Sequence, residues 1–174
     1  MRIKLPYLSV VVALYAVLFA AQAAVAKEVR FPATGNPAFS LRMPDDWTTE
    51  EGDDDSLLVA SGDHSMAFTL ILETSDEPRD DDLLDEIAKV ALKVAKAAPA
   101  KRKEAASMAG FPGFSYASAT TNDAGTVIRV TLYLVRIDKT HLAVCNRIEA
   151  ADNSPAQRKI ADTVLRSMTI SPPR

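Results

Sequence analysis

The sequence is poor in the residues that usually hold metals or act as nucleophiles. It contains one cysteine and two histidines in 174 residues. A single cysteine excludes an internal disulfide, and two histidines far apart in the chain, His64 and His141, argue against a histidine-rich zinc site. Cys145 lies in an apolar run typical of a strand, and we interpret it as a small buried hydrophobe. An intermolecular disulfide and a nucleophilic thiol are the alternatives.

Catalytic motifs are also missing. Asp63, His64 and Ser65 place the residue types of a hydrolytic triad side by side, but such triads are assembled from distant segments. The Gly110–Gly113 segment lacks the further glycine and the helix start that a phosphate-binding loop needs, and it is typical of a turn. The sequence therefore predicts no catalytic, cofactor-binding or metal-ligating residue.

Acidic residues outnumber basic ones, 23 to 20. A net negative charge argues against nucleic acid and anionic membranes as partners. The acidic residues cluster at Asp53, Asp54 and Asp55, and again between Asp76 and Asp82. Neither cluster has the spacing of an EF-hand, so we expect a solvated loop and a helix N-terminus. The one basic run, Lys101–Lys103, is expected to lie in a solvated loop or to complement the preceding helix end.

The amino-terminal segment has the pattern of a secretory signal peptide. Arg2 and Lys4 give a positive start, an apolar run follows, and Ala24–Ala26 offers the small-x-small pattern that signal peptidase cuts. We therefore expect cleavage after Ala26, a single domain over residues 27–174, and a periplasmic or secreted location. An uncleaved anchor is the alternative, because the run is about long enough to span a bilayer. No cysteine follows the run, so no lipid anchor is expected.

Apolar patterns in the remaining chain predict the order strands, helix, strands, helix. Strands are expected at 39–44, 57–60 and 66–72, and in three stretches between 114 and 148. Helices are expected at 80–96 and directly after Ser154, where Gln157 completes a capping box. Neighbouring antiparallel strands with two helices indicate an α+β fold with one central sheet.

Each predicted helix carries an apolar stripe that we expect to face the core. In the first helix the stripe comprises Leu83, Ile87, Val90 and Val94, widened by Leu84 and Ala91. In the second helix it comprises Ile160, Ala161, Val164 and Met168.

The segment from Phe39 to Trp47 resembles the opening of PsbP-like and DcrB-like domains. The shared spacing is Phe-x-Leu-x-x-Pro-x-x-Trp, here Phe39, Leu41, Pro44 and Trp47. The later elements follow in a similar order: an Asp-Leu-Leu helix, a glycine-containing segment, a three-strand meander and a closing helix. The resemblance implies an α/β/α sandwich around an antiparallel sheet. It also implies a non-enzymatic accessory or binding protein with no shared catalytic residues.

Three functions stay open from the sequence. The first is a non-enzymatic periplasmic domain that binds a protein partner in the cell envelope. The second is an immunity protein whose acidity steers it to a basic toxin, and the third is a hydrolase that uses His64 or His141. The candidate partner-binding residues are Trp47, Asp53, Asp54 and Asp55. Tryptophan is enriched at binding hot spots, although a position that plugs the core is the alternative for Trp47.

Overall fold

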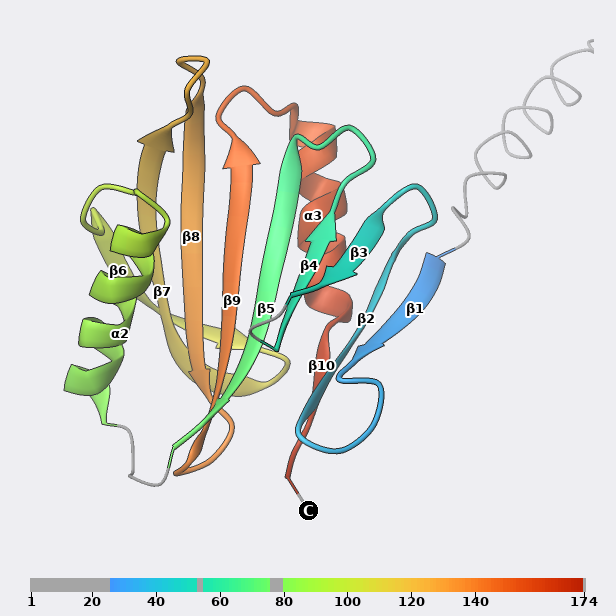
Figure 1. The fold of residues 1–174 in the computed structure, drawn as a ribbon, viewed down its shortest axis with the longest axis vertical. Coiled ribbons are helices and arrows are strands. Elements are labelled where there is room, and N and C mark those ends of the chain that lie inside the picture. The colour runs from blue at the N-terminus through green and yellow to red at the C-terminus, as the bar shows by residue number, and fades with distance from the viewer. Residues whose placement is uncertain (1–25, 53–54, 76–79, 174) are drawn as a thin grey trace, which may run out of the picture.

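The computed structural model describes residues 26–52, 55–75 and 80–173. Within these ranges the chain forms two antiparallel sheets and two helices (Figure 1). The predicted signal peptide up to residue 25, two of the candidate partner-binding residues, Asp53 and Asp54, and part of the second acidic cluster lie outside the described residues. Among the helices that are described, none is long and apolar enough to cross a membrane.

The larger sheet has seven strands in the order β3-β4-β5-β9-β8-β7-β6. After β5 the chain passes through a helix to the far edge of the sheet, where β6 lies. It then returns strand by strand, so that β9, the last strand of this sheet in the sequence, lies between β5 and β8. The strands are β3 (Thr48–Glu51), β4 (Ser56–Ala60), β5 (Met66–Thr74), β6 (Arg102–Met108), β7 (Phe111–Thr121), β8 (Val127–Arg136) and β9 (His141–Ala150).

A second, smaller sheet joins the two ends of the described chain. It has the order β1-β2-β10, with strands β1 (Ala26–Phe31), β2 (Ala38–Pro44) and β10 (Thr169–Ser171). The opening motif of the resemblance lies in and directly after β2. Phe39 and Leu41 of this strand are fully buried in the same core cluster as Phe68 of the larger sheet. The small sheet therefore packs on one face of the large one.

Helices α2 (Asp81–Val94) and α3 (Pro155–Ser167) cover opposite faces of the seven-stranded sheet (Figure 1). Neighbouring residues on β9 show this, because Val144 belongs to the core cluster under α2 and Cys145 to the cluster under α3. Successive side chains of a strand point to opposite faces. The predicted α+β class and α/β/α layering are thus confirmed, with the small sheet sharing the α3 side.

Both helices begin at a side-chain cap. The Asp80 carboxylate accepts a hydrogen bond from the Leu83 backbone N–H at 2.9 Å. The predicted capping box of α3 is present, with Gln157 N–H bonded to Ser154 Oγ and Ser154 N–H bonded to Gln157 Oε1. Two backbone N–H groups that the helix itself cannot satisfy are thereby bonded.

The predicted orientation of the α2 stripe is only partly correct. The buried side chains of this helix are Leu84, Ala88 and Leu92. Of the six residues predicted to face the core, Leu84 is buried and Ile87 and Ala91 are half-buried, but Leu83, Val90 and Val94 are 40%, 61% and 78% exposed. Eight of the fourteen residues of this helix are apolar, and the sheet covers only one edge of the sector that they form. In α3 the stripe is correct except for Ile160, which is exposed.

Two edge strands and one turn also differ from the predictions. Arg102 and Lys103 of the basic run, which was expected to lie in a loop, form the start of β6. Strand β3 is formed by exposed polar residues, so neither strand had an apolar pattern from which it could be predicted. The turn expected over Gly110–Gly113 is centred on Ala109 and Gly110, which have φ angles of 54° and 85°. Gly113 lies inside β7, where a Cβ atom would come within 2.0 Å of the Leu134 carbonyl oxygen.

Candidate functional site

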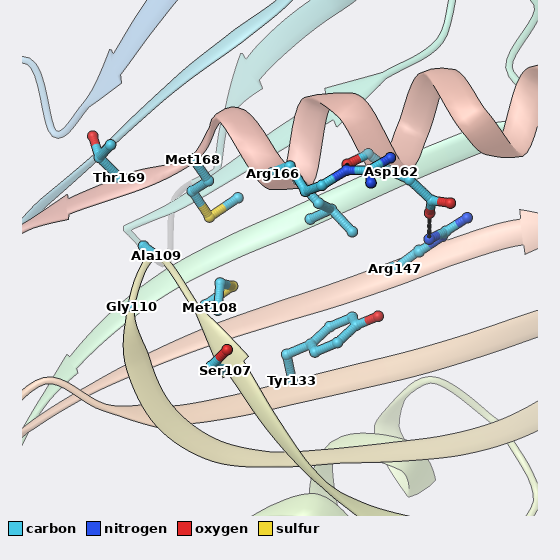
Figure 2. Close-up of a pocket in the computed structure, with 11 residues that line it drawn as sticks. Ser107, Met108, Ala109, Gly110, Tyr133, Arg147, Asp162, Arg166, Met168 and Thr169 are labelled. Atoms are coloured by element: carbon cyan, nitrogen blue, oxygen red, sulfur yellow. Dashed lines mark hydrogen bonds and ion pairs between the residues drawn. The ribbon is translucent and has the colours of Figure 1, made fainter.

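A pocket of about 620 Å³ lies between the β6–β7 turn, the sheet and α3 (Figure 2). The sheet contributes Tyr133 from β8 and Arg147 from β9, and α3 contributes Asp162. Ala109 and Gly110 form the turn at its mouth, where their left-handed backbone bends β6 into β7. The pocket therefore joins three elements that are distant in the sequence.

Arg147 is the central charge of this pocket, and it is fully paired. Its Nη1 lies 2.7 Å from Asp162 Oδ1, and its Nη2 lies 2.6 Å from Glu149 Oε2. Burial alone would lower the pKa of Arg147, but the bonds to Asp162 and Glu149 outweigh it and raise that pKa. Burial also raises the pKa of the neighbouring Tyr133. The network connects α3 to the sheet.

The opposite face of the sheet carries a more apolar hollow, about 680 Å³ in volume, which we call the α2 groove. Its floor comes from β5 and β9, with Thr69, Ile71, Asn146 and Ile148. Its wall is the exposed flank of α2, with Leu83, Ile87, Val90 and Val94.

Exposed hydrophobic side chains gather around the α2 groove. Within the described part of the chain, six large hydrophobic residues are exposed: Leu58, Leu83, Val90, Val94, Val127 and Ile160. Three of them line the groove. Leu58 borders it, because Leu58 pairs directly with Thr69 and therefore shares its face of the sheet. Contiguous apolar patches of this kind mark binding sites more often than scattered residues do.

The other flank of α2 is basic. It borders a hollow of about 740 Å³, and the cationic residues that line this hollow are Lys89, Lys93, Lys96, Lys101, Arg102 and Lys103. Lys103 Nζ lies 2.6 Å from Asp85 Oδ1 and 4.2 Å from the centre of the Phe114 ring. Tyr116 donates a hydrogen bond to the same carboxylate at 2.6 Å. The bonds from Lys103 and Tyr116 lower the pKa of Asp85.

No protein-family model and no curated protein matches the sequence. Solved structures do match. Cyanobacterial PsbP (CyanoP) of Synechocystis shares 12% identity over 87% of this chain and 95% of its own, with a TM-score of 0.59. The chain has the PsbP-like fold.

Two further structures share this fold. LpqN of Mycobacterium tuberculosis, which is involved in cell envelope biogenesis, is 17% identical over 90% of this chain and 97% of its own, with a TM-score of 0.56. The Ran-binding protein Mog1p of Saccharomyces cerevisiae is 12% identical over 86% of this chain and 97% of its own, with a TM-score of 0.51. At these identities the likeness establishes the PsbP-like architecture and not the activity.

In this PsbP-like domain, Trp47 belongs to the core. Its side chain is 4% exposed and stacks on Phe68 with ring centroids 5.8 Å apart. Among the acidic candidates, Asp55 is exposed and has a φ angle of 55°. The structure therefore does not bring Trp47 and Asp55 together into a common site.

The histidines and the cysteine are also separated. Cys145 is fully buried, and burial raises the pKa of its thiol to about 12. His141 opens β9 and lies 2.9 Å from Asp138, whereas His64 occupies the β4–β5 turn. In the β5–β9 register Thr74 pairs with His141 and Met66 with Glu149, so the two histidines lie at opposite ends of the strand pair. Over the described ranges, no three metal-binding side chains converge.

The Asp63-His64-Ser65 segment of the PsbP-like domain closes a turn. Asp63 Oδ1 accepts hydrogen bonds from the Ser61 hydroxyl at 2.7 Å and the Ser65 hydroxyl at 2.8 Å. Its other oxygen accepts one from Gln157 of α3 at 2.8 Å. The Ser61 bond is the largest of several that hold the pKa of Asp63 well below its usual range. The carboxylate thus joins the turn to α3.

The α2 groove was missed at the level of sequence, although one signal was present. Strand β5 reads Met-Ala-Phe-Thr-Leu-Ile-Leu, so that apolar side chains point to both faces of the sheet. Such a strand is expected to be covered on both faces. On the α3 face Met66, Phe68 and Leu70 are buried, whereas Thr69 and Ile71 on the other face are only partly buried.

Proposed function

We propose that this PsbP-like domain is a non-enzymatic binding domain of the cell envelope, and that it binds a protein partner in the α2 groove. The observation that carries the proposal is the concentration of exposed hydrophobic side chains at one place. Leu58, Leu83, Val90 and Val94 border a single groove, and burying them against a partner would remove this apolar area from water.

The non-enzymatic part of the proposal is supported by the chemistry of the titratable groups. Arg147, the central charge of the α3-side pocket, is neutralised by its own ion pairs, and Cys145 is buried and protonated. The two histidines lie at opposite ends of β5 and β9. An enzyme of the predicted hydrolase type needs a nucleophile and a base within hydrogen-bond reach.

The cell-envelope part is supported by the signal-peptide pattern of the sequence and by the likeness to LpqN, a protein involved in cell envelope biogenesis. The protein partner is supported by the size of the groove and by its apolar lining, which are typical of a surface that receives an apolar segment.

Co-purification from the envelope of the producing cell tests this proposal. The full chain, its Val90→Lys variant and its Val127→Lys variant are compared by quantitative proteomics. Both positions are exposed, but Val127 lies outside the groove. We expect the Val90 variant to lose its partner by about tenfold or more, because a charged lysine would have to leave water within an apolar contact. The Val127 variant should retain it. Equal recovery by all three proteins, or no reproducible partner, would refute the proposal.

A further inference from the structure

Helix α2 packs on one face of the seven-stranded sheet, and no described element covers the other half of that face. The buried side of α2 packs on β7, β8 and β9 through a cluster that includes Leu84, Tyr116, Leu132 and Val144. Beyond β9 the same face continues over β5 and β4, where Figure 1 shows no helix in front of the strands. Neighbouring strands are about 4.8 Å apart, so β9, β5 and β4 present a strip roughly 10–15 Å wide. One α-helix with its side chains is about 10 Å wide.

Three adjacent rows in the floor of this strip carry no charge. Three rows of directly paired residues cross β4, β5 and β9, and they are Ser56–Ile71–Val144, Leu58–Thr69–Asn146 and Ala60–Ala67–Ile148. A sheet face that looks into water normally carries polar and charged side chains. The composition of these rows is that of a face covered by another element.

The wall of the groove has the spacing of a helix-packing ridge. Leu83, Val90 and Val94 are separated by seven and four residues, so they follow one line along α2. A second helix beside α2 at the usual 8–10 Å separation would bury this line and the strip at once. An acyl chain is narrower than the strip and would leave much of the floor in water.

The acidic residues around the groove favour a helix that carries basic side chains. The charged residues that line it, Glu73 and Glu86, are both acidic, and Glu86 already pairs with Lys89 of α2, whose Nζ lies 2.6 Å from Glu86 Oε1. Glu50 of β3 pairs directly with Leu58 and adds a third carboxylate at the far edge. The lysines of α2 line the hollow on the other side of the helix. Anionic lipids and fatty acids would be repelled by this rim, whereas lysine or arginine at the sides of a bound helix would be attracted.

A polar atom in the floor lacks a partner. Asn146 Oδ1 is buried and accepts no hydrogen bond from the described residues. Asn146 lies on β9 between Thr69 and Leu132 in the register, at the edge of the strip beside the strands that α2 covers. A buried acceptor without a partner is costly.

From these observations we infer that the occupant of the α2 groove is an amphipathic α-helix of the partner protein, with an apolar ridge flanked by lysine or arginine. This inference rests on the proposed function and specifies its partner. The helix completes the layer that α2 begins, beside α2 and above β9, β5 and β4.

Site-specific photo-crosslinking tests the inference with the full chain in the envelope of the producing cell. A photoreactive phenylalanine analogue replaces Val90 or Leu58 in the groove, or Val127 as a control outside it. We expect both groove positions to crosslink to one partner segment at residues spaced three, four or seven apart, with basic residues between them. The control position should not reach that segment.

The crosslinked segment is then synthesised and titrated against the purified protein. It should gain helical circular dichroism on binding, and a central proline should weaken it about tenfold or more because proline breaks a helix. Replacing its basic residues by glutamate should weaken it several-fold, and increasingly so at low salt. Crosslinks to an extended segment, to a second copy of this chain or to lipid, or none, would overturn the inference. If Val90→Lys still abolishes co-purification in that case, the proposed function stands and only the helix is wrong.

Discussion

The two faces of the seven-stranded sheet are covered to different degrees. On one face, α3 and the small sheet together enclose Phe39, Phe68 and Leu70 completely. On the other, α2 alone covers β7, β8 and β9, while Leu58 and the flank of α2 stay in contact with water. Burial of apolar area is the main source of folding stability. The closed face therefore supplies most of the stability, and the open face can be used for binding without unfolding the domain.

Two adjacent leucines on β4 test this difference, and we expect the largest effect there. Leu57 is 2% exposed on the closed face, and Leu58 is 36% exposed on the open one. Leu57→Ala should lower the free energy of unfolding by about 2–5 kcal/mol, because it leaves a cavity in the core. Leu58→Ala should cost less than about 1 kcal/mol. Urea denaturation measures both, and similar losses would contradict the division between the faces.

The buried ion network is the second test of the closed face. Arg147→Met should lower the free energy of unfolding by about 3 kcal/mol, since Glu149 is left buried without its closest cation. Arg102→Ala is the control, because its pair with Glu104 is exposed and should contribute less than about 1 kcal/mol. If both variants unfold at the same urea concentration as the unsubstituted protein, the network does not fasten α3.

Removing the cap of each helix allows a finer comparison of the two faces. Ser154→Ala in α3 and Asp80→Ala in α2 each remove one capping bond and should each cost about 1 kcal/mol. Amide hydrogen exchange then shows which parts of the protein are destabilised. We expect faster exchange throughout α3 and its neighbours for Ser154→Ala, but faster exchange confined to α2 for Asp80→Ala. A global effect from Asp80→Ala would show that α2 is as tightly coupled to the core as α3.

Cys145 is buried on the closed face, and its substitution should have the smallest effect on the free energy of unfolding at neutral pH. Burial raises the pKa of its thiol from 9.0 to about 12. The folded state therefore keeps this proton longer than the unfolded state, so stability is unaffected below pH 9 and falls as pH rises from there towards 12. Cys145→Ala should flatten this alkaline slope in urea denaturation. At pH 8 a thiol reagent should label the native protein only as fast as it unfolds, and rapid labelling would show that the face opens.

Local patterns in the sequence were sufficient for most elements of this fold. The alternation over residues 39–44 predicted β2, the apolar run over residues 66–72 predicted β5, and Ser154 with Gln157 predicted the start of α3. The polar strands β3 and β6 could not be predicted in the same way, because edge strands lack the apolar alternation of inner ones. The candidate site could not be predicted either, because its floor and wall are distant in the chain.

What the sequence determined by itself is local: where helices begin, which runs become strands, and that α2 has an apolar sector. Only the tertiary structure decided that β9 lies between β5 and β8, and that Leu84 and Ala88 face the sheet while Val90 and Val94 face the groove. The physical reason is that an apolar stripe specifies burial but not the partner that buries it. When a helix has more apolar surface than its sheet covers, the packing of the whole domain selects the buried edge. In this protein that selection left the other edge of α2 exposed beside β5 and β9, and so formed the groove.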